Sequence, residues 1–179
     1  MRLFIALPFE AQILDSMTDV QSACRAAGVR GNFTKRENLH LTLAFLGEVR
    51  DPRPVTAAIR RVPAPQITLS FSRQGLFRDI LVAEFVRNAQ LDAYVKSLRA
   101  ALDDAGISYD RKPFRPHVTL IRRALIPDGA DMRSLFSPMA GLLTQPSEVR
   151  LMRTDFIDGR PKYTCLYAEP AVADQECDK

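Results

Sequence analysis

The chain has 179 residues, of which 46% are hydrophobic, and this composition predicts one substantial globular domain or two small lobes that share a core. No stretch reaches the roughly 20 apolar residues of a membrane-spanning helix, and the apolar run at residues 3–7 is too short for a signal peptide. The formal net charge of +4 is too small to indicate a nucleic-acid partner by itself.

The first half of the chain alternates predicted strands and helices. Residues 3–7 form an apolar strand, and apolar side chains at helical spacing predict a helix over residues 10–27 that ends at Gly28. A polar connection leads to a strand over residues 40–46, which Gly47 ends. Next come a helix over residues 52–62, a strand over 67–71, a turn at Gly75 and a strand over 80–86.

The same order then repeats. Asn88 is a suitable N-cap for a helix that ends at Gly106, and a strand follows over residues 117–122. Residues 131–139 are predicted as a short helix, and residues 149–156 and 162–167 as a hairpin. We therefore expect an internally duplicated, two-lobed single domain over residues 1–168 and a flexible C-terminal tail over 169–179.

The repeat is clearest around the only two histidines of the chain. Each begins a four-residue motif, His40-Leu41-Thr42-Leu43 or His117-Val118-Thr119-Leu120. Side chains alternate between the two faces of a strand. Each motif therefore presents an imidazole and a hydroxyl on one face and two aliphatic side chains on the other.

Two such motifs facing each other suit a substitution at phosphorus. Imidazole titrates near pH 6.5, so one ring can accept a proton from the nucleophile while the other protonates the departing oxygen. Thr42 and Thr119 would donate hydrogen bonds to the non-bridging oxygens, and a nearby arginine would offset their charge. This scheme needs no metal ion and no cofactor.

Each feature has a structural alternative. A histidine in a strand can be a satisfied core residue, threonine favours strands in any case, and the basic residues near the motifs can form a solvated face. A metal site lacks a third ligand, and no Gly-x-Ser-x-Gly motif indicates a serine nucleophile. The scattered Cys24, Cys165 and Cys177 favour a reducing, cytoplasmic compartment over a disulfide framework.

Several segments together resemble the two-histidine (2H) phosphoesterases, and within them the LigT-like RNA 2′,3′-cyclic phosphodiesterases, also called 2′-5′ RNA ligases. They are RLFIAL at residues 2–7, ENLHLTLAFLG at 37–47, Phe71 with GLF at 75–77, and FRPHVTL at 114–120. The resemblance runs in the same order to about Tyr167. It implies an α+β fold in which two pseudo-symmetric lobes with antiparallel sheets surround a central cleft, with the helices outside.

The resemblance also implies residue roles. On the family pattern His40 is the proton donor to the 3′ oxygen, His117 is the proton acceptor that activates water, and Arg122 contacts phosphate. Phe45 matches an aromatic residue that stacks on the base, although a core role for it is equally open. Residues 33–36 depart from the family pattern, so the rim that contacts the nucleotide is expected to differ.

The sequence thus predicts a metal-independent phosphodiesterase that opens 2′,3′-cyclic phosphate ends of RNA or nucleotides to 2′-phosphates. One alternative is 2′-5′ RNA ligation by the same pair of histidines. A second alternative, from another functional class, is a non-catalytic RNA-binding module, which would not need both His-x-Thr pairs. Neither a membrane nor an obligate protein partner is expected.

Overall fold

The computed structural model describes residues 1–172. Its helices and strands are, in chain order, β1 (Arg2–Leu7), α1 (Ala11–Ala26), β2 (Arg30–Phe33), η1 (Arg36–Asn38), β3 (Leu41–Glu48), α2 (Arg53–Arg60), β4 (Leu69–Phe77), β5 (Ile80–Phe85), α3 (Ala89–Asp104), β6 (His117–Leu125), α4 (Met132–Leu135), η2 (Ser137–Met139), β7 (Leu143–Thr144), β8 (Glu148–Ile157) and β9 (Arg160–Pro170). No helix within this range is both long and apolar enough to span a bilayer.

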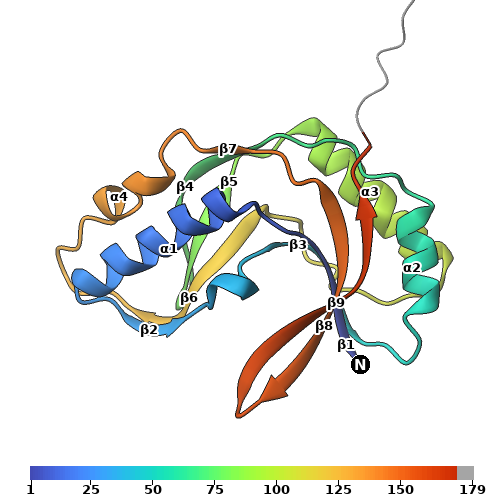
Figure 1. The fold of residues 1–179 in the computed structure, drawn as a ribbon, viewed down its shortest axis with the longest axis horizontal. Coiled ribbons are helices and arrows are strands. Elements are labelled where there is room, and N and C mark those ends of the chain that lie inside the picture. Colours follow the sequence, from blue (N-terminus) through green and yellow to red (C-terminus); the bar gives the residue numbers. More distant parts are fainter. Residues whose placement is uncertain (173–179) are drawn as a thin grey trace, which may run out of the picture.

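The strands form an antiparallel sheet that divides into two lobes (Figure 1). The order is β7-β4-β5-β6-β3-β1-β8-β9, and β2 also pairs with β6. At the centre, β3 and β6 meet through one residue pair, Leu41 with Val118. Helices α1 and α4 lie outside the lobe that contains β6, and α2 and α3 lie outside the lobe that contains β3. The predicted two-lobed α+β architecture is confirmed.

The internal duplication is visible in the order of the elements. The unit β1, α1, glycine, β3 recurs as β5, α3, glycine, β6. Gly28 and Gly106 have φ of +83° and +68°, and the amide of the residue after each bonds to a carbonyl of the helix at 2.9 Å. Helix α1 contacts β6 and helix α3 contacts β3. Each helix therefore covers the lobe of the other half's motif strand, which ties the two halves together.

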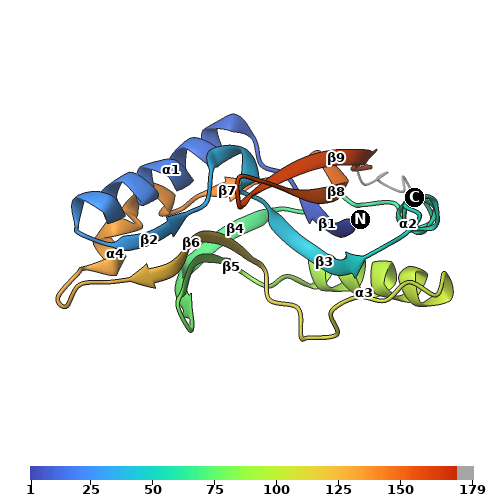
Figure 2. The same cartoon turned by 90° about the horizontal axis from the view of Figure 1, so that it is seen from below.

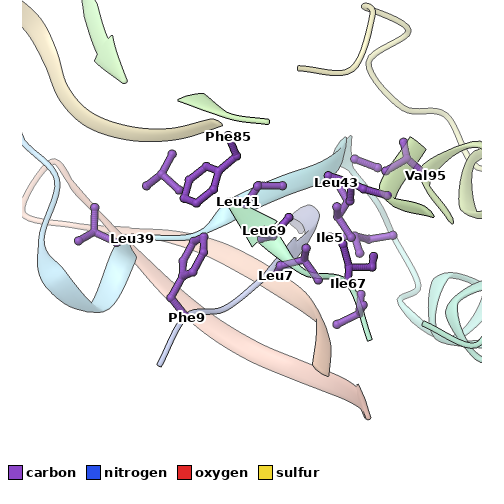
Figure 3. Close-up of a cluster of buried hydrophobic side chains, with 14 of the residues drawn as sticks. Ile5, Leu7, Phe9, Leu39, Leu41, Leu43, Ile67, Leu69, Phe85 and Val95 are labelled. Carbon is purple, nitrogen blue, oxygen red and sulfur yellow. The ribbon is translucent and has the colours of Figure 1, made fainter. Parts of the chain in front are cut away.

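The core lies between the sheet and the helices (Figure 3). Leu41 and Leu43 of β3 are buried in it, as are Ile5 and Leu7 of the neighbouring β1. The aromatic rings of Phe9 and Phe85 stack with their centroids 5.6 Å apart. The aliphatic residues of the first motif therefore anchor β3, as the alternation in the sequence predicts.

Two expectations about strands were wrong. Residues 30–33 form the short strand β2, although the sequence predicts only a polar connection there. Gly75 lies inside β4, opposite Val82 of β5, and the turn comes later, at Arg78 and Asp79. A Cβ atom at position 75 would meet the carboxylate of Glu84, so a larger residue there would require this side chain to move.

Two strand ends also differ from the prediction. Gly47 does not end β3, which continues to Glu48, and the register with β1 shifts beside this glycine. The predicted flexible tail starts too early, because β9 continues to Pro170 and the amide of Val172 bonds to the carbonyl of Ala64 at 2.7 Å. The rest of that predicted tail, residues 173–179, lies outside the described residues.

Candidate active site

A cavity of about 520 Å³ lies where the two lobes meet. Five of the six site residues expected from the sequence line it, namely both histidines, both motif threonines and Arg122. The remaining lining residues come from β2, from the segment after it and from the β8–β9 hairpin, and they are Gly31, Asn32, Phe33, Thr34, Lys35, Asn38, Gly159, Arg160, Pro161 and Tyr163. The fold thus brings the two distant motifs into one site.

The contact between β3 and β6 explains why the motifs meet. Leu41 pairs with Val118, and each of these residues directly follows a histidine. Both aliphatic side chains are fully buried, so the histidines and threonines on either side of them point to the opposite face of the sheet. Because the strands are antiparallel, the two motifs approach each other in opposite directions. Each histidine therefore lies toward the threonine of the other motif.

Both imidazole rings are held in the same way. His40 Nδ1 lies 2.7 Å from the carbonyl oxygen of Asn38, and His117 Nδ1 lies 2.7 Å from that of Arg115. A carbonyl can only accept, so Nδ1 carries the proton in both rings and Nε2 is the basic nitrogen of the neutral form. His40 Nε2 accepts from the Thr42 hydroxyl at 3.1 Å.

The two rings differ in their surroundings. The His40 ring stacks on Phe4 at 4.7 Å between centroids and meets the Tyr163 ring edge-on at 5.3 Å. Burial lowers the pKa of His40 to about 4, and the positive charge of Arg122 acts in the same direction. Among residues 1–172, His117 has one aromatic neighbour, Phe77, whose ring lies edge-on at 5.0 Å. At neutral pH, His40 is therefore uncharged in the free protein.

The cavity attracts anions. The described residues that line it include Lys35, Arg122 and Arg160 and no aspartate or glutamate. Lys35 approaches Glu37 at 3.9 Å, whereas Arg122 and Arg160 form no ion pair with any residue in the range 1–172. Within the same range, no cluster of three or more His, Cys, Asp or Glu side chains is placed to hold a metal ion. The lining is therefore suited to a phosphate group.

Sequence reasoning missed two residues that hold His40. The backbone carbonyl of Asn38 accepts from the His40 ring, and the side-chain amide of this buried residue donates to the carbonyl of Pro161 at 3.0 Å. Tyr163, from the same hairpin, packs against the ring. Asn38 gave a weak signal as a polar residue two positions before the motif. Tyr163 gave none, because only tertiary folding brings the hairpin to this place.

Gly31 allows β2 to lie close to β6 beside Arg122. It has φ of +146°, and a Cβ atom there would lie 2.8 Å from the Arg122 carbonyl oxygen and 2.9 Å from that of Arg123. We expect Gly31→Ala to displace β2, to lower the free energy of unfolding by about 1–3 kcal/mol and to raise KM. Chemical denaturation and steady-state kinetics measure the two effects.

Gly129→Ala is the matched control for this prediction. Gly129 also has a positive φ, of +80°, but no atom of the described residues lies within 4 Å of where its Cβ would be. The Gly129→Ala variant therefore measures the loss of stability from a positive φ alone, without a steric clash such as the one between β2 and β6 at position 31. Equal losses of stability in the two variants would contradict the explanation given for Gly31.

Phe45, the sixth expected residue, does not line the cavity. It lines an adjoining groove that shares Thr42 and His117 with the cavity. The Arg2 guanidinium lies 5.0 Å from the centre of the Phe45 ring. Phe45 is half-buried on β3, and the structure places it in the groove beside the histidines rather than in the cavity that Arg122 and the hairpin line.

Comparison with protein families gives one match in two parts. A model described as LigT like phosphoesterase matches residues 7–87 and again residues 84–167. Each matched segment contains one His-x-Thr motif. The two matches therefore follow the internal duplication seen in both the sequence and the fold.

Curated relatives share one name. An RNA 2′,3′-cyclic phosphodiesterase of Escherichia coli (strain K12) is 29% identical over 170 residues, which cover 92% of this chain and 93% of the relative. One from Geobacillus stearothermophilus is 28% identical over 183 residues, covering 94% of this chain and 57% of the relative. The chain thus spans little more than half of the Geobacillus protein but nearly all of the Escherichia coli one.

Solved structures show the same likeness. The structure of Escherichia coli LigT complexed with 3′-AMP has a TM-score of 0.77 at 26% identity, and the match covers 95% of this chain and 96% of that one. A structure described as a phosphoesterase has a TM-score of 0.81, also at 26% identity, with 95% and 97% covered. The similarity therefore extends over both lobes.

Proposed function

The chain belongs to the LigT-like phosphoesterase family, and we propose that it opens 2′,3′-cyclic phosphate ends of RNA to 2′-phosphates without a metal ion. The observation that carries the proposal is the pair of imidazoles in one cationic cavity, each held through Nδ1 by a backbone carbonyl. The shared name of the curated relatives supports the choice of substrate.

The proposed reaction is an in-line substitution at phosphorus. His117 Nε2 accepts a proton from water while the water oxygen forms its bond to phosphorus. The bond from phosphorus to the 3′ oxygen breaks, and His40 Nε2–H gives its proton to that oxygen. The product is a 2′-phosphate beside a free 3′ hydroxyl. Thr42, Thr119 and Arg122 donate hydrogen bonds to the non-bridging oxygens, where negative charge develops.

For this role His40 must gain a proton when substrate binds. In the free protein its burial favours the neutral form, which by itself suits a base. A bound phosphate brings a negative charge into the same cavity. A negative charge close to the His40 ring stabilises its protonated form and so raises its pKa. The Thr42 hydroxyl, which donates to Nε2 of the neutral ring, can rotate and leave the new N–H directed at the substrate.

Arg122 contributes charge rather than proton transfer in this proposal. We expect Arg122→Gln to lower kcat/KM by about 10- to 100-fold, since a charge-assisted hydrogen bond contributes about 1.5–3 kcal/mol. Steady-state kinetics on a dinucleotide that ends in a 2′,3′-cyclic phosphate measure this loss. Arg123→Gln is the control, because Arg123 is the next residue of β6 and does not line the cavity. Equal losses in the two variants would contradict a phosphate contact by Arg122.

The proposed function is tested by product analysis in EDTA. A short RNA that ends in a 2′,3′-cyclic phosphate should give a 2′-phosphate at the same rate with and without the chelator. A second RNA with a 5′ hydroxyl, added to the same reaction, reveals any 2′-5′ ligated product. A rate that falls in EDTA and returns with a divalent metal ion would contradict the metal-independent mechanism, and binding without turnover would favour a non-catalytic role.

Two further assignments stay proposals. We propose that Phe45 stacks on a base, because its ring lines the groove beside His117. We also propose a reducing, cytoplasmic compartment, supported by Cys24 and Cys165, which are both free thiols.

A further inference from the structure

Two grooves continue from the catalytic cavity along the lobe of β3. The first, here called the aromatic groove, has a volume of about 430 Å³ and contains Phe45, Phe77 and Phe114 with Arg99, Lys112 and Arg115. It shares Thr42 and His117 with the cavity. Its position follows the segment between α3 and β6, which runs beside β3 (Figure 2).

The second groove, here called the α3 groove, lies along helix α3 and has a volume of about 410 Å³. It shares Arg99 and Phe114 with the aromatic groove and adds Arg87, Lys96 and Tyr109. The shared lining residues place the aromatic groove between the cavity and the α3 groove. The three neighbouring hollows, here called the path, extend from the two histidines to the surface of α3.

The path carries cations that no carboxylate neutralises. Each of its three carboxylates already has a partner, as Asp110 pairs with Lys112 at 2.9 Å, Asp92 with Arg87 at 2.9 Å and Asp103 with Arg111 at 2.6 Å. Lys96, Arg99 and Arg115 form no ion pair with any residue in the described part of the chain, 1–172. Arg99 Nε is buried and has no hydrogen-bond partner within that part.

Aromatic rings that alternate with cations are typical of a surface that binds single-stranded nucleic acid. Bases stack on the rings and the cations neutralise the phosphates. On the other way out of the cavity, past Lys35 and Arg160, the Arg25 guanidinium covers Phe33 at 3.9 Å, and Tyr163 packs against Phe4 and His40. In the two grooves, guanidinium groups also approach three of the rings, with Arg2 5.0 Å from the centre of Phe45, Arg115 5.8 Å from that of Phe77 and Arg111 4.2 Å from that of Tyr109. Among residues 1–172, no cation lies over the Phe114 ring, and the grooves bring more rings together with cations than the other way out does.

We propose that the nucleotides upstream of the cyclic phosphate lie in the aromatic groove and then in the α3 groove. The substrate is then the 3′ end of a single-stranded RNA segment rather than a free cyclic nucleotide. This inference rests on the proposed function and extends it, since it assigns a path to the part of the substrate that does not react.

The test compares kcat/KM for a 2′,3′-cyclic mononucleotide with that for a tetranucleotide ending in the same group. We expect the wild-type protein to favour the tetranucleotide by about tenfold or more, since each stacked base contributes roughly 1–3 kcal/mol. If Lys96, Arg99 and Arg115 each contact one phosphate, log kcat/KM for the tetranucleotide should fall with the logarithm of the salt concentration at a slope of about −2. We expect Lys96→Glu to reduce the tetranucleotide preference at least fivefold and to make the salt slope shallower.

Two variants complete the experiment. Arg133→Glu makes the same change of charge on α4, in the other lobe, and should leave the preference as it is in the wild type. Arg160→Glu probes the other way out of the cavity. The inference is overturned if the wild-type protein shows no preference, or if Arg160→Glu removes the preference while Lys96→Glu does not. Failure of the wild-type protein to hydrolyse either substrate would overturn the proposed function, and this inference with it.

Discussion

Replacement of either histidine by asparagine should lower kcat by about 10²- to 10⁴-fold, the usual contribution of a positioned acid or base. Asparagine suits this test because its side-chain amide can donate to the carbonyl of Asn38 or Arg115 in place of Nδ1. What the variant lacks is Nε2. Single-turnover kinetics on an RNA with a cyclic phosphate end measure the loss of the chemical step itself.

The two variants should then respond differently to a substrate with sulfur in place of the 3′ oxygen. A thiolate leaves without needing a proton, so the proton donor becomes dispensable. We expect the sulfur substrate to restore His40→Asn to within about tenfold of the wild-type rate and to leave His117→Asn slow. If the sulfur substrate instead restored His117→Asn, the roles of proton donor and proton acceptor would be exchanged. This outcome has to be tested because the lowered pKa of His40 in the free protein would by itself suit a base.

Thermal unfolding of both variants is the control for these kinetic effects. His40 packs against both Phe4 and Tyr163, so His40→Asn should lose some stability, whereas the more exposed His117 should tolerate the change. A variant that is folded at the assay temperature and still slow reports the chemistry. Near-normal rates in both folded variants would contradict acid–base catalysis by this pair.

The second large effect is on stability at acid pH. His40 has a pKa of about 4 in the folded protein and about 6.5 when unfolded, because burial disfavours its charged form. Between pH 6.5 and pH 4, His40 is protonated in the unfolded chain but neutral in the folded protein. The contribution of the neutral ring to the free energy of unfolding is therefore fully present above pH 6.5 and is lost as the pH falls toward 4. The free energy of unfolding should fall by about 3 kcal/mol between pH 7 and pH 4 from this residue.

Chemical denaturation of the wild-type protein and of His40→Asn across this pH range isolates the effect. The difference in free energy of unfolding between the two should shrink as the pH falls, since asparagine does not titrate. The pKa values of Asp51 and Asp110 are lowered by Arg53 and Lys112, and the stability that they add is lost only below their unfolded values near 3.8. Parallel curves for the two proteins down to pH 4 would show that His40 is not kept neutral by burial.

Local patterns were enough to determine much of this protein. Period-2 and period-3.6 spacing predict β1, α1, β3, α3 and β6, and the glycines that follow both long helices have positive φ, as expected of helix ends. The duplicated His-x-Thr motif identifies the residues that meet in the cavity. These signals survive folding because they depend on neighbours only a few residues apart, whose relative positions a strand or helix fixes.

Tertiary structure alone decided the rest. Strand β2 has no apolar alternation and exists because Gly31 lets it approach β6. The environment of His40 is set by Phe4 and Tyr163, and a hydrogen bond joins two residues of the cavity lining, Asn38 and Pro161, that are 123 positions apart in the chain. Phe45 lies beside the cavity rather than in it. Burial, pKa and the shape of a cleft depend on which distant segments pack together, and no local pattern in the sequence carries that information.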